Sequence, residues 1–306
     1  MQFFKFTNID FIRNRRKFFV IFGLLFLWST CVIVRRGGSN YGIDFTGGIL
    51  MHISFQNKVD LRDLRIALEE SGMNSFELQS SNNIIIIRAK KSVNFQEKLK
   101  NSIQNFVQSM FPNNLVKIER IEYVGPAVSE YLSRQAIYGF LFAFLGMIAY
   151  ITFRFKSSFW GIAAILGVIH DVVVTFGFVV LLGKEVNITV VAALLTIAGY
   201  SINDTIVLFN RIKENLKLAL SQNFAVLVNR SINDVLARTI VTSITVFIVA
   251  CSLFFFGGEV LHTFAYVMVI GTVLGVFSTI FVCAPLIYEL EIKRNKRLKK
   301  NTCKTK

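Results

Sequence analysis

The chain has 306 residues, of which 53% are hydrophobic and 17% charged, and its mean hydropathy is +0.54. This balance excludes an ordinary soluble domain and places the chain among integral membrane proteins. A net charge of +15 would suggest a nucleic-acid partner in a soluble protein, but most basic residues here lie at the edges of apolar segments. The charge therefore predicts membrane topology, and we expect no nucleic-acid partner.

Six apolar segments are expected to cross the membrane as helices. All but the last fit the roughly 17–25 residues that a tilted spanning helix needs. The last is longer, so it can tilt more strongly or extend into the cytosol. The expected spans are residues 18–34, 136–153, 159–182, 188–210, 239–256 and 260–288. The other expected parts are an N-terminal segment 1–17, a domain 35–135, a loop 211–238 and a tail 289–306.

The distribution of charge assigns the two sides of the membrane. Both terminal segments and the loops after the second and fourth spans carry 20 Lys and Arg against five acidic residues. The two short loops on the other side, residues 183–187 and 257–259, carry one Lys and two Glu. Both termini are therefore expected in the cytosol, where the eight basic residues of the tail suit anionic lipid headgroups.

Residues 35–135 are expected to form one small α+β domain outside the cytosol. Four segments have the residue pattern of strands: Ile49–Phe55, Ser75–Gln79, Ile84–Ala89 and Val116–Val124. Two have the pattern of amphipathic helices: Asp60–Ser71 and Phe95–Phe111. The resulting order β-α-β-β-α-β predicts a ferredoxin-like arrangement.

Two glycine-containing segments frame this domain. Tyr41–Gly48 leaves the first span, and Glu122–Ser129 enters the second. Because glycine adopts backbone conformations closed to other residues, both segments could simply be tight joints at the membrane surface. The functional alternative is a hinge between domain and membrane, made of Asp44, Gly47, Gly48, Gly125 and Pro126.

Ionisable residues occur inside two of the spans. His170 and Asp171 lie at the centre of the third span, and Asn203 and Asp204 lie in the fourth. Because an ionised carboxylate at mid-bilayer costs roughly 3 kcal/mol or more, such residues usually have a function. His170 and Asn203 could instead only hydrogen-bond between helices. Asp204 is the first functional candidate, and we interpret all four residues as one polar seam.

A capping-box pattern at Ser231–Asp234 predicts that the fifth helix begins near Ser231. Arg238 then lies seven residues inside this helix, and Asp204 lies seven residues before the fourth span ends at Arg211. In antiparallel neighbours both reach about 10 Å below the surface, where they could form an ion pair. The alternative is that Arg238 extends its side chain to the surface.

The remaining patterns predict packing rather than chemistry. Gly271 and Gly275 have the spacing of close-packed membrane helices. The four cysteines have no disulfide or metal spacing, and the sequence has no Walker-type phosphate loop. We therefore expect no cofactor, no metal and no enzymatic activity.

Several motifs together resemble the SecF family of Sec translocase accessory subunits. The match runs from about Asn40 to Tyr288. It consists of Tyr41–Gly48, Val124–Pro126, His170–Asp171, Gly199–Asn215 and Arg238–Ser243.

The resemblance implies a six-helix protein of the bacterial inner membrane, related to the resistance-nodulation-division superfamily. It implies action with SecD beside the SecYEG channel, on a translocating preprotein, driven by the proton gradient, with a YajC-like accessory subunit as a further partner. By the same resemblance, Asp204 matches the family's functional carboxylate and Arg238 the arginine of its Arg-Thr motif. One departure is Asp234, where the family often has Gln.

Two other functions are compatible with the sequence. One is export of small molecules or lipids within the same superfamily, although a domain of about 100 residues leaves little room for a large apolar ligand pocket. The other is a non-transporting scaffold for the translocon, which would leave Asp204, Asp171 and Arg238 unexplained. The residues around Asp204 suit either H⁺ or Na⁺ as the coupling ion.

Overall fold

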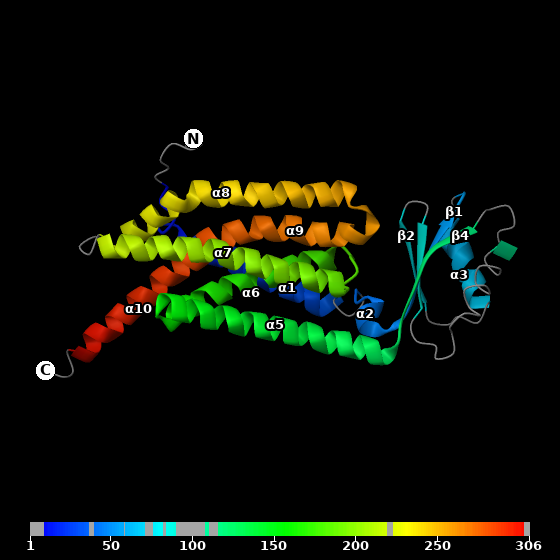
Figure 1. Ribbon diagram of the computed structural model, residues 1–306, viewed down its shortest axis with the longest axis horizontal. Helices are drawn as coiled ribbons and strands as arrows, with labels where there is room; N and C mark the ends of the chain where they lie inside the picture. Colours follow the sequence, from blue (N-terminus) through cyan, green and yellow to red (C-terminus); the bar gives the residue numbers. More distant parts are fainter. Residues whose placement is uncertain are drawn as a thin grey trace. The chain divides into compact units, whose positions relative to one another are not determined.

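The computed structural model describes residues 9–36, 40–57, 59–70, 76–81, 84–89, 108–109, 116–218 and 223–302. The chain divides into two compact units, which Figure 1 traces in the colours of the sequence. The helical unit comprises Met1–Asn40 and Ile137–Lys306, and the small unit comprises Tyr41–Ala136.

Within the described residues, six helical segments are long and apolar enough to cross a membrane, as the sequence predicts. The first five are α1 (Arg15–Arg36), α5 (Pro126–Phe155), α6 (Ser158–Leu181), α7 (Ile188–Leu218) and α8 (Phe224–Phe256). The sixth, Leu261–Arg294, combines most of α9 (Gly258–Ser278) with the π-helix η2 (Thr279–Cys283) and the first part of α10 (Ala284–Thr302). The chain is therefore a multi-pass membrane protein.

The centre of the helical unit is formed by α6, α7 and α9, which contact one another (Figure 1). Most residues of α6 are buried, whereas α1, α5 and α8 expose apolar side chains along most of their length. On α5, for example, Phe153 is 84% exposed. Such surfaces suit lipid or another membrane helix.

Glycines allow the central helices to approach closely. A Cβ atom on Gly271 of α9 would lie 2.6 Å from the side chain of Ile197 on α7. A Cβ on Gly275 would lie 3.5 Å from Ser201, again on α7. The predicted close-packing role of Gly271 and Gly275 is therefore confirmed.

The predicted start of the fifth helix is wrong, because α8 begins at Phe224. Its N-cap is Asn223, whose side chain accepts a hydrogen bond from the backbone N–H of Ala225 at 3.0 Å. Ser231 lies inside the helix and donates to the carbonyl of Leu227 at 2.8 Å. The spacing that suggested a cap thus arises from polar residues with tertiary partners on a continuous helix.

The small unit contains a four-stranded sheet in the order β2-β3-β1-β4, with all neighbouring strands antiparallel. The strands are β1 (Gly48–Phe55), β2 (Phe76–Ser81), β3 (Ile84–Ala89) and β4 (Val116–Val124). The helix α3 (Leu61–Glu70) connects β1 to β2, which run parallel with β3 between them. This is the split β-α-β arrangement of a ferredoxin-like domain.

The four strands and α3 confirm the predicted order of elements in this domain. The predicted second helix, Phe95–Phe111, lies outside the described residues except for residues 108–109. The ferredoxin-like topology is thus established for the sheet and the first helix.

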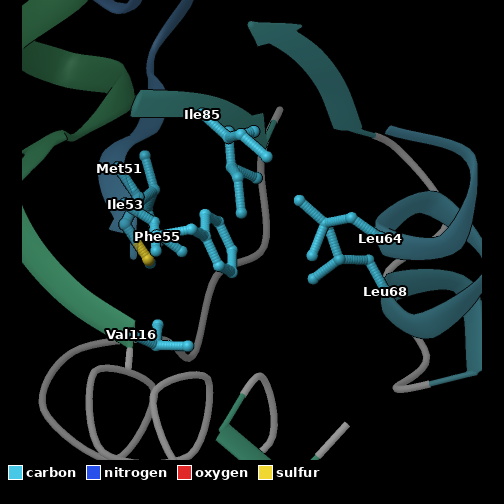
Figure 2. Close-up of a cluster of buried hydrophobic side chains, with 9 residues drawn as sticks. Met51, Ile53, Phe55, Leu64, Leu68, Ile85 and Val116 are labelled. Atoms are coloured by element: carbon cyan, nitrogen blue, oxygen red, sulfur yellow. The ribbon is translucent and has the colours of Figure 1, made fainter. Parts of the chain in front are cut away.

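The core of the small unit lies between the sheet and α3 (Figure 2). Figure 2 shows Leu64 and Leu68 of α3 pointing toward Phe55 of β1. Leu64, Leu68 and Ile53 are fully buried. Alternation along β1 sends Ile49, Met51, Ile53 and Phe55 to this face, because successive strand residues point to opposite sides.

Replacement of Leu64 by Ala is expected to destabilise the small unit by roughly 2–5 kcal/mol, because it leaves a cavity in this core. Protease cleavage within residues 41–136 of the full chain, followed over a urea series, measures the effect. Ile66→Ala on the same helix is the control, since Ile66 is 55% exposed. Equal protease resistance of the two variants would contradict the assigned core.

Candidate functional site

Asp204 lies on α7 where this helix faces α8, and it is only 4% exposed. The hydroxyl of Tyr200, one turn earlier, donates a hydrogen bond to Ser243 Oγ of α8 at 2.6 Å. Ser243 also lies close enough to the Asp204 carboxylate to influence it electrostatically. One oxygen of that carboxylate, Oδ2, is buried without a hydrogen-bond partner in the described part of the chain. Asp204 therefore has a free acceptor position inside the apolar layer.

Arg238 of α8 is the basic residue that interacts electrostatically with Asp204. Its side chain is exposed, and it makes no ion pair within 4.0 Å of Asp204 among the residues that the structure describes. The ion pair that the sequence suggested for these two residues is therefore not formed in the described part of the chain, and the helix ends used to predict it differ from those of α7 and α8. The charges of Asp204 and Arg238 attract across a gap, so the carboxylate is not held by a direct ionic contact.

Polar side chains form a stripe on the exposed surface of α7 and α8. The α7/α8 polar stripe consists of Thr196, Asn203, Arg238, Thr242, Thr245 and Ser252, all exposed. The Thr and Ser hydroxyls donate to backbone carbonyls of their own helices, for example Thr196 to Ala192 at 2.8 Å. A polar stripe on an otherwise apolar membrane surface is typical of a contact with another membrane helix.

Asp171 is fully buried between α6, α7 and α9. Its Oδ2 atom accepts hydrogen bonds from Ser201 Oγ of α7 and from Ser278 Oγ of α9, both at 2.6 Å. Its Oδ1 atom lies 3.2 Å from Nδ1 of His170. One carboxylate thus joins three membrane helices.

His170 connects this carboxylate to α1. Its ring centroid lies 5.3 Å from that of Phe22 and 6.2 Å from that of Phe26, both on α1. Its second ring nitrogen, Nε2, is buried without a hydrogen-bond partner in the described residues. The imidazole is therefore bonded on one side and enclosed by aromatic rings on the other.

The structure divides the predicted seam into two clusters on different faces of α7. Ser201 belongs to the cluster of Asp171, whereas Tyr200 and Asp204 belong to the cluster on α8. Asn203 lies on the exposed face, in the α7/α8 polar stripe. Sequence reasoning missed the serines 201, 243 and 278, because serine is common in membrane helices and its hydroxyl usually bonds to its own backbone.

The predicted hinge residues lie together in the small unit. Gly47 has a positive φ of 67°, and a Cβ atom there would lie 3.3 Å from the carbonyl oxygen of Val124. Gly48 pairs with Val124 in the sheet. Gly125 separates β4 from α5 by a single residue, and Pro126 occupies the first turn of α5, where its fixed φ is favourable.

Asp44 lies next to these glycines in the sequence, on the short helix α2 (Ile43–Thr46). The two segments that frame the domain thus meet in one tight joint.

A further polar network lies at the loop ends of α7 and α8. Arg211 forms an ion pair with Asp234 at 2.9 Å, and the Asn215 side chain donates to Ser231 Oγ at 2.9 Å. Ser231 and Asp234, which the sequence suggested as a capping box, thus bond to α7 instead of capping a helix. In the described residues, no three Asp, Glu, His or Cys side chains converge as a metal site would require.

Comparison with known proteins places these features in a family. The family described as "Protein export membrane protein SecD/SecF, C-terminal" matches residues 102–293. The protein translocase subunit SecF of Endomicrobium trichonymphae is 68% identical, over 98% of this chain and 96% of that protein. The SecF subunit of Calditerrivibrio nitroreducens is 39% identical, over 95% of this chain and 96% of that protein.

A solved structure gives the same result for the fold. The crystal structure of SecDF from Thermus thermophilus, a translocon-associated membrane protein, superposes on this chain with a TM-score of 0.85 and 34% sequence identity. The match covers 93% of this chain and 39% of the longer SecDF chain.

Proposed function

The chain belongs to the SecF family, and from this we propose that it is a subunit of the Sec protein translocase that uses the proton gradient to promote the late stage of protein export. The observation that carries the proposal is Asp204, a buried carboxylate in a membrane helix with one unoccupied oxygen. An ionised carboxylate is strongly unfavourable inside a bilayer. Such residues usually have a function, for example the binding and release of a proton.

The proposed mechanism is a protonation switch at Asp204. While the carboxylate is ionised, the attraction of Arg238 holds α7 and α8 together. A proton on the unoccupied oxygen removes this attraction, and the packing of the two helices changes. Each charge that crosses the full membrane field provides about 2.3 kcal/mol per 100 mV.

We further propose that SecD packs against the α7/α8 polar stripe. The name of the SecDF protein supports a SecD partner, and this chain corresponds to only part of that longer chain. The exposed Asn203 and Arg238 supply polar contacts that lipid cannot satisfy. On this proposal, the exposed Asn203 and Arg238 beside the buried Asp204 are shielded from lipid when SecD is bound.

The remaining assignments follow from the same proposal. The protein lies in the bacterial inner membrane with both termini in the cytosol, as the charge distribution predicts. The small unit then lies outside the cytosol. The SecYEG channel, the translocating preprotein and a YajC-like subunit are further proposed partners of the chain. The joint formed by Asp44, Gly47, Gly48, Gly125 and Pro126 is proposed to carry movement between the helices and this unit.

The proposal is tested by preprotein import into inverted membrane vesicles that contain SecYEG and SecD, with and without this chain. We expect the chain to accelerate late translocation only when a proton gradient is imposed. If the chain accelerates import equally without a gradient, it is a scaffold and the coupling proposal fails.

A replacement of Tyr200 by Phe tests the hydrogen bond beside Asp204. Without the Tyr200 hydroxyl, Ser243 loses the hydrogen bond that it accepts from α7 beside Asp204. We expect gradient-dependent import to fall about three- to tenfold, the loss corresponding to one hydrogen bond. Tyr138→Phe on the exposed surface of α5 is the control. Equal rates in the two variants would remove Tyr200 from the site.

A further inference from the structure

We propose that four basic residues at one end of the helical unit form a binding site for the phosphate headgroup of an anionic membrane lipid. These residues, the α5/α7 basic cluster, are Arg154, Lys156, Lys213 and Lys217. None of them belongs to the proposed coupling site, and the cluster is separate from the basic tail. The proposal therefore goes beyond the proposed function and does not depend on it.

The cluster lies where the apolar helices reach the membrane surface. Arg154 and Lys156 come one and three residues after the end of the second expected span. Lys213 and Lys217 come about one and two helical turns after the end of the fourth. Basic side chains just beyond an apolar span reach the level of the lipid headgroups.

A buried aromatic ring holds two of these cations in place. The ammonium of Lys213 lies 5.4 Å from the centre of the Phe155 ring and donates a hydrogen bond to the carbonyl of Arg154 at 3.5 Å. The guanidinium of Arg154 lies 5.7 Å from the centre of the same ring. Phe155 is buried and stacks on Trp160 at a ring-centre distance of 5.1 Å. Two cations that are 59 residues apart in the chain are thus brought together.

The cluster has no compensating acidic partner. Lys213 interacts electrostatically with the three other members, and like charges repel. Among the residues that the structure describes, no member of the cluster forms an ion pair. The acidic residue nearest in the sequence, Glu214, pairs with Arg211 at 3.2 Å. The cluster can therefore accept an anion.

A role in membrane topology alone would not require this arrangement. Basic residues that only fix orientation act by their number, and their side chains can spread apart in water. Lys213 is instead half-buried and held at the carbonyl of Arg154, close to the other positive charges. A phosphate group would relieve the repulsion, because it accepts charge-assisted hydrogen bonds from ammonium and guanidinium groups together.

Apolar side chains beside the cluster favour a lipid over a soluble phosphate compound. Phe153 immediately precedes Arg154 and is 84% exposed, and Phe159 at the start of α6 is 40% exposed. Acyl chains that continue from a headgroup at this level can pack against these rings. A soluble phosphate compound would use the positive charges but would leave the rings uncovered. Basic sites at the ends of membrane helices suit anionic lipids for this reason.

Native mass spectrometry of the full-length chain, alone and assembled with SecD, measures the binding of individual lipids. The probes are phosphatidylglycerol, which is anionic, and phosphatidylcholine, which has a phosphate but no net charge. We expect both samples to bind phosphatidylglycerol in preference to phosphatidylcholine. Millimolar inorganic phosphate should not displace the bound lipid.

A double substitution tests the position of the site. Lys213→Gln/Lys217→Gln should weaken the binding of phosphatidylglycerol about thirtyfold, since each basic residue near the surface contributes about fivefold. Arg16→Gln/Lys17→Gln is the matched control, because it removes the same charge from exposed positions at the start of α1. The control should retain most of the affinity.

Equal binding of the two lipids by the unsubstituted chain would overturn the proposal, and this comparison requires no variant to fold. Equal losses in the two double variants would also contradict it, because binding would then follow total charge. Displacement by inorganic phosphate would assign a soluble anion to the cluster. Loss of the lipid in the sample with SecD would assign this surface to the partner subunit. None of these readouts depends on Asp204, so the two proposals are tested separately.

Discussion

Replacement of Asp204 by Asn is expected to reduce protein export to the rate observed without a proton gradient. The amide has nearly the shape of the carboxylic acid but cannot gain or lose the proton, so the switch between α7 and α8 stays in its neutral state. The attraction of Arg238 for the carboxylate disappears with the charge. Late translocation into inverted vesicles, with and without an imposed gradient, measures the loss.

The matched control is Asp234→Asn, which removes another carboxylate from the same pair of helices. Asp234 forms an ion pair with Arg211 at the loop end, where the side chains are partly exposed. Such ion pairs contribute about 1 kcal/mol or less, so this variant should retain the response to the gradient. A full response in Asp204→Asn, with normal amounts of folded protein, would show that the carboxylate is not the coupling group.

The second large effect is expected for Gly271→Ala, which should destabilise the helical unit by roughly 1–3 kcal/mol. The added Cβ would lie 2.6–2.8 Å from three atoms of the Ile197 side chain. Because Ile197 is fully buried, it has no free space into which it can rotate. Thermal unfolding of the purified chain in detergent measures the change.

A compensating substitution provides the decisive comparison. Ile197→Ala removes the clashing atoms, so the Gly271→Ala/Ile197→Ala chain should be more stable than the sum of the single changes predicts. Gly146→Ala on α5 is the control, since a Cβ there meets no atom within 4 Å. This control should be neutral or stabilising, because alanine favours helix. Additive effects at residues 271 and 197 would contradict the contact.

The spans and strands could be predicted from the sequence because each depends on a local pattern. The apolar length of a membrane helix is read directly from composition, and the six expected spans correspond to six helical segments. The alternation in Val116–Val124 and the isoleucine run Ile84–Ala89 predicted β4 and β3 with the observed bounds.

Features that depend on tertiary partners could not be predicted in this way. The pattern at Ser231 indicated a helix start, but Asn215 of α7 donates a hydrogen bond to this serine inside α8, near the loop end of the helix. The pairing of Asp171 with Ser201 and Ser278 depends on how three helices are rotated about their axes. Periodicity gives the face on which a residue lies, but it does not say which neighbour that face meets.

The hydroxyls of the α7/α8 polar stripe have a consequence for the biogenesis of the complex. Thr196, Thr242, Thr245 and Ser252 already donate to carbonyls of their own helices. In a newly inserted chain that has not yet met its partner, these four donors are therefore already hydrogen-bonded in lipid. Within the stripe, these four hydroxyls offer a partner small side chains to pack against, whereas Asn203 and Arg238 supply the polar contacts that lipid cannot satisfy. Synthesis of the two subunits then need not be simultaneous. An unassembled chain can remain folded in the bilayer until its partner is inserted.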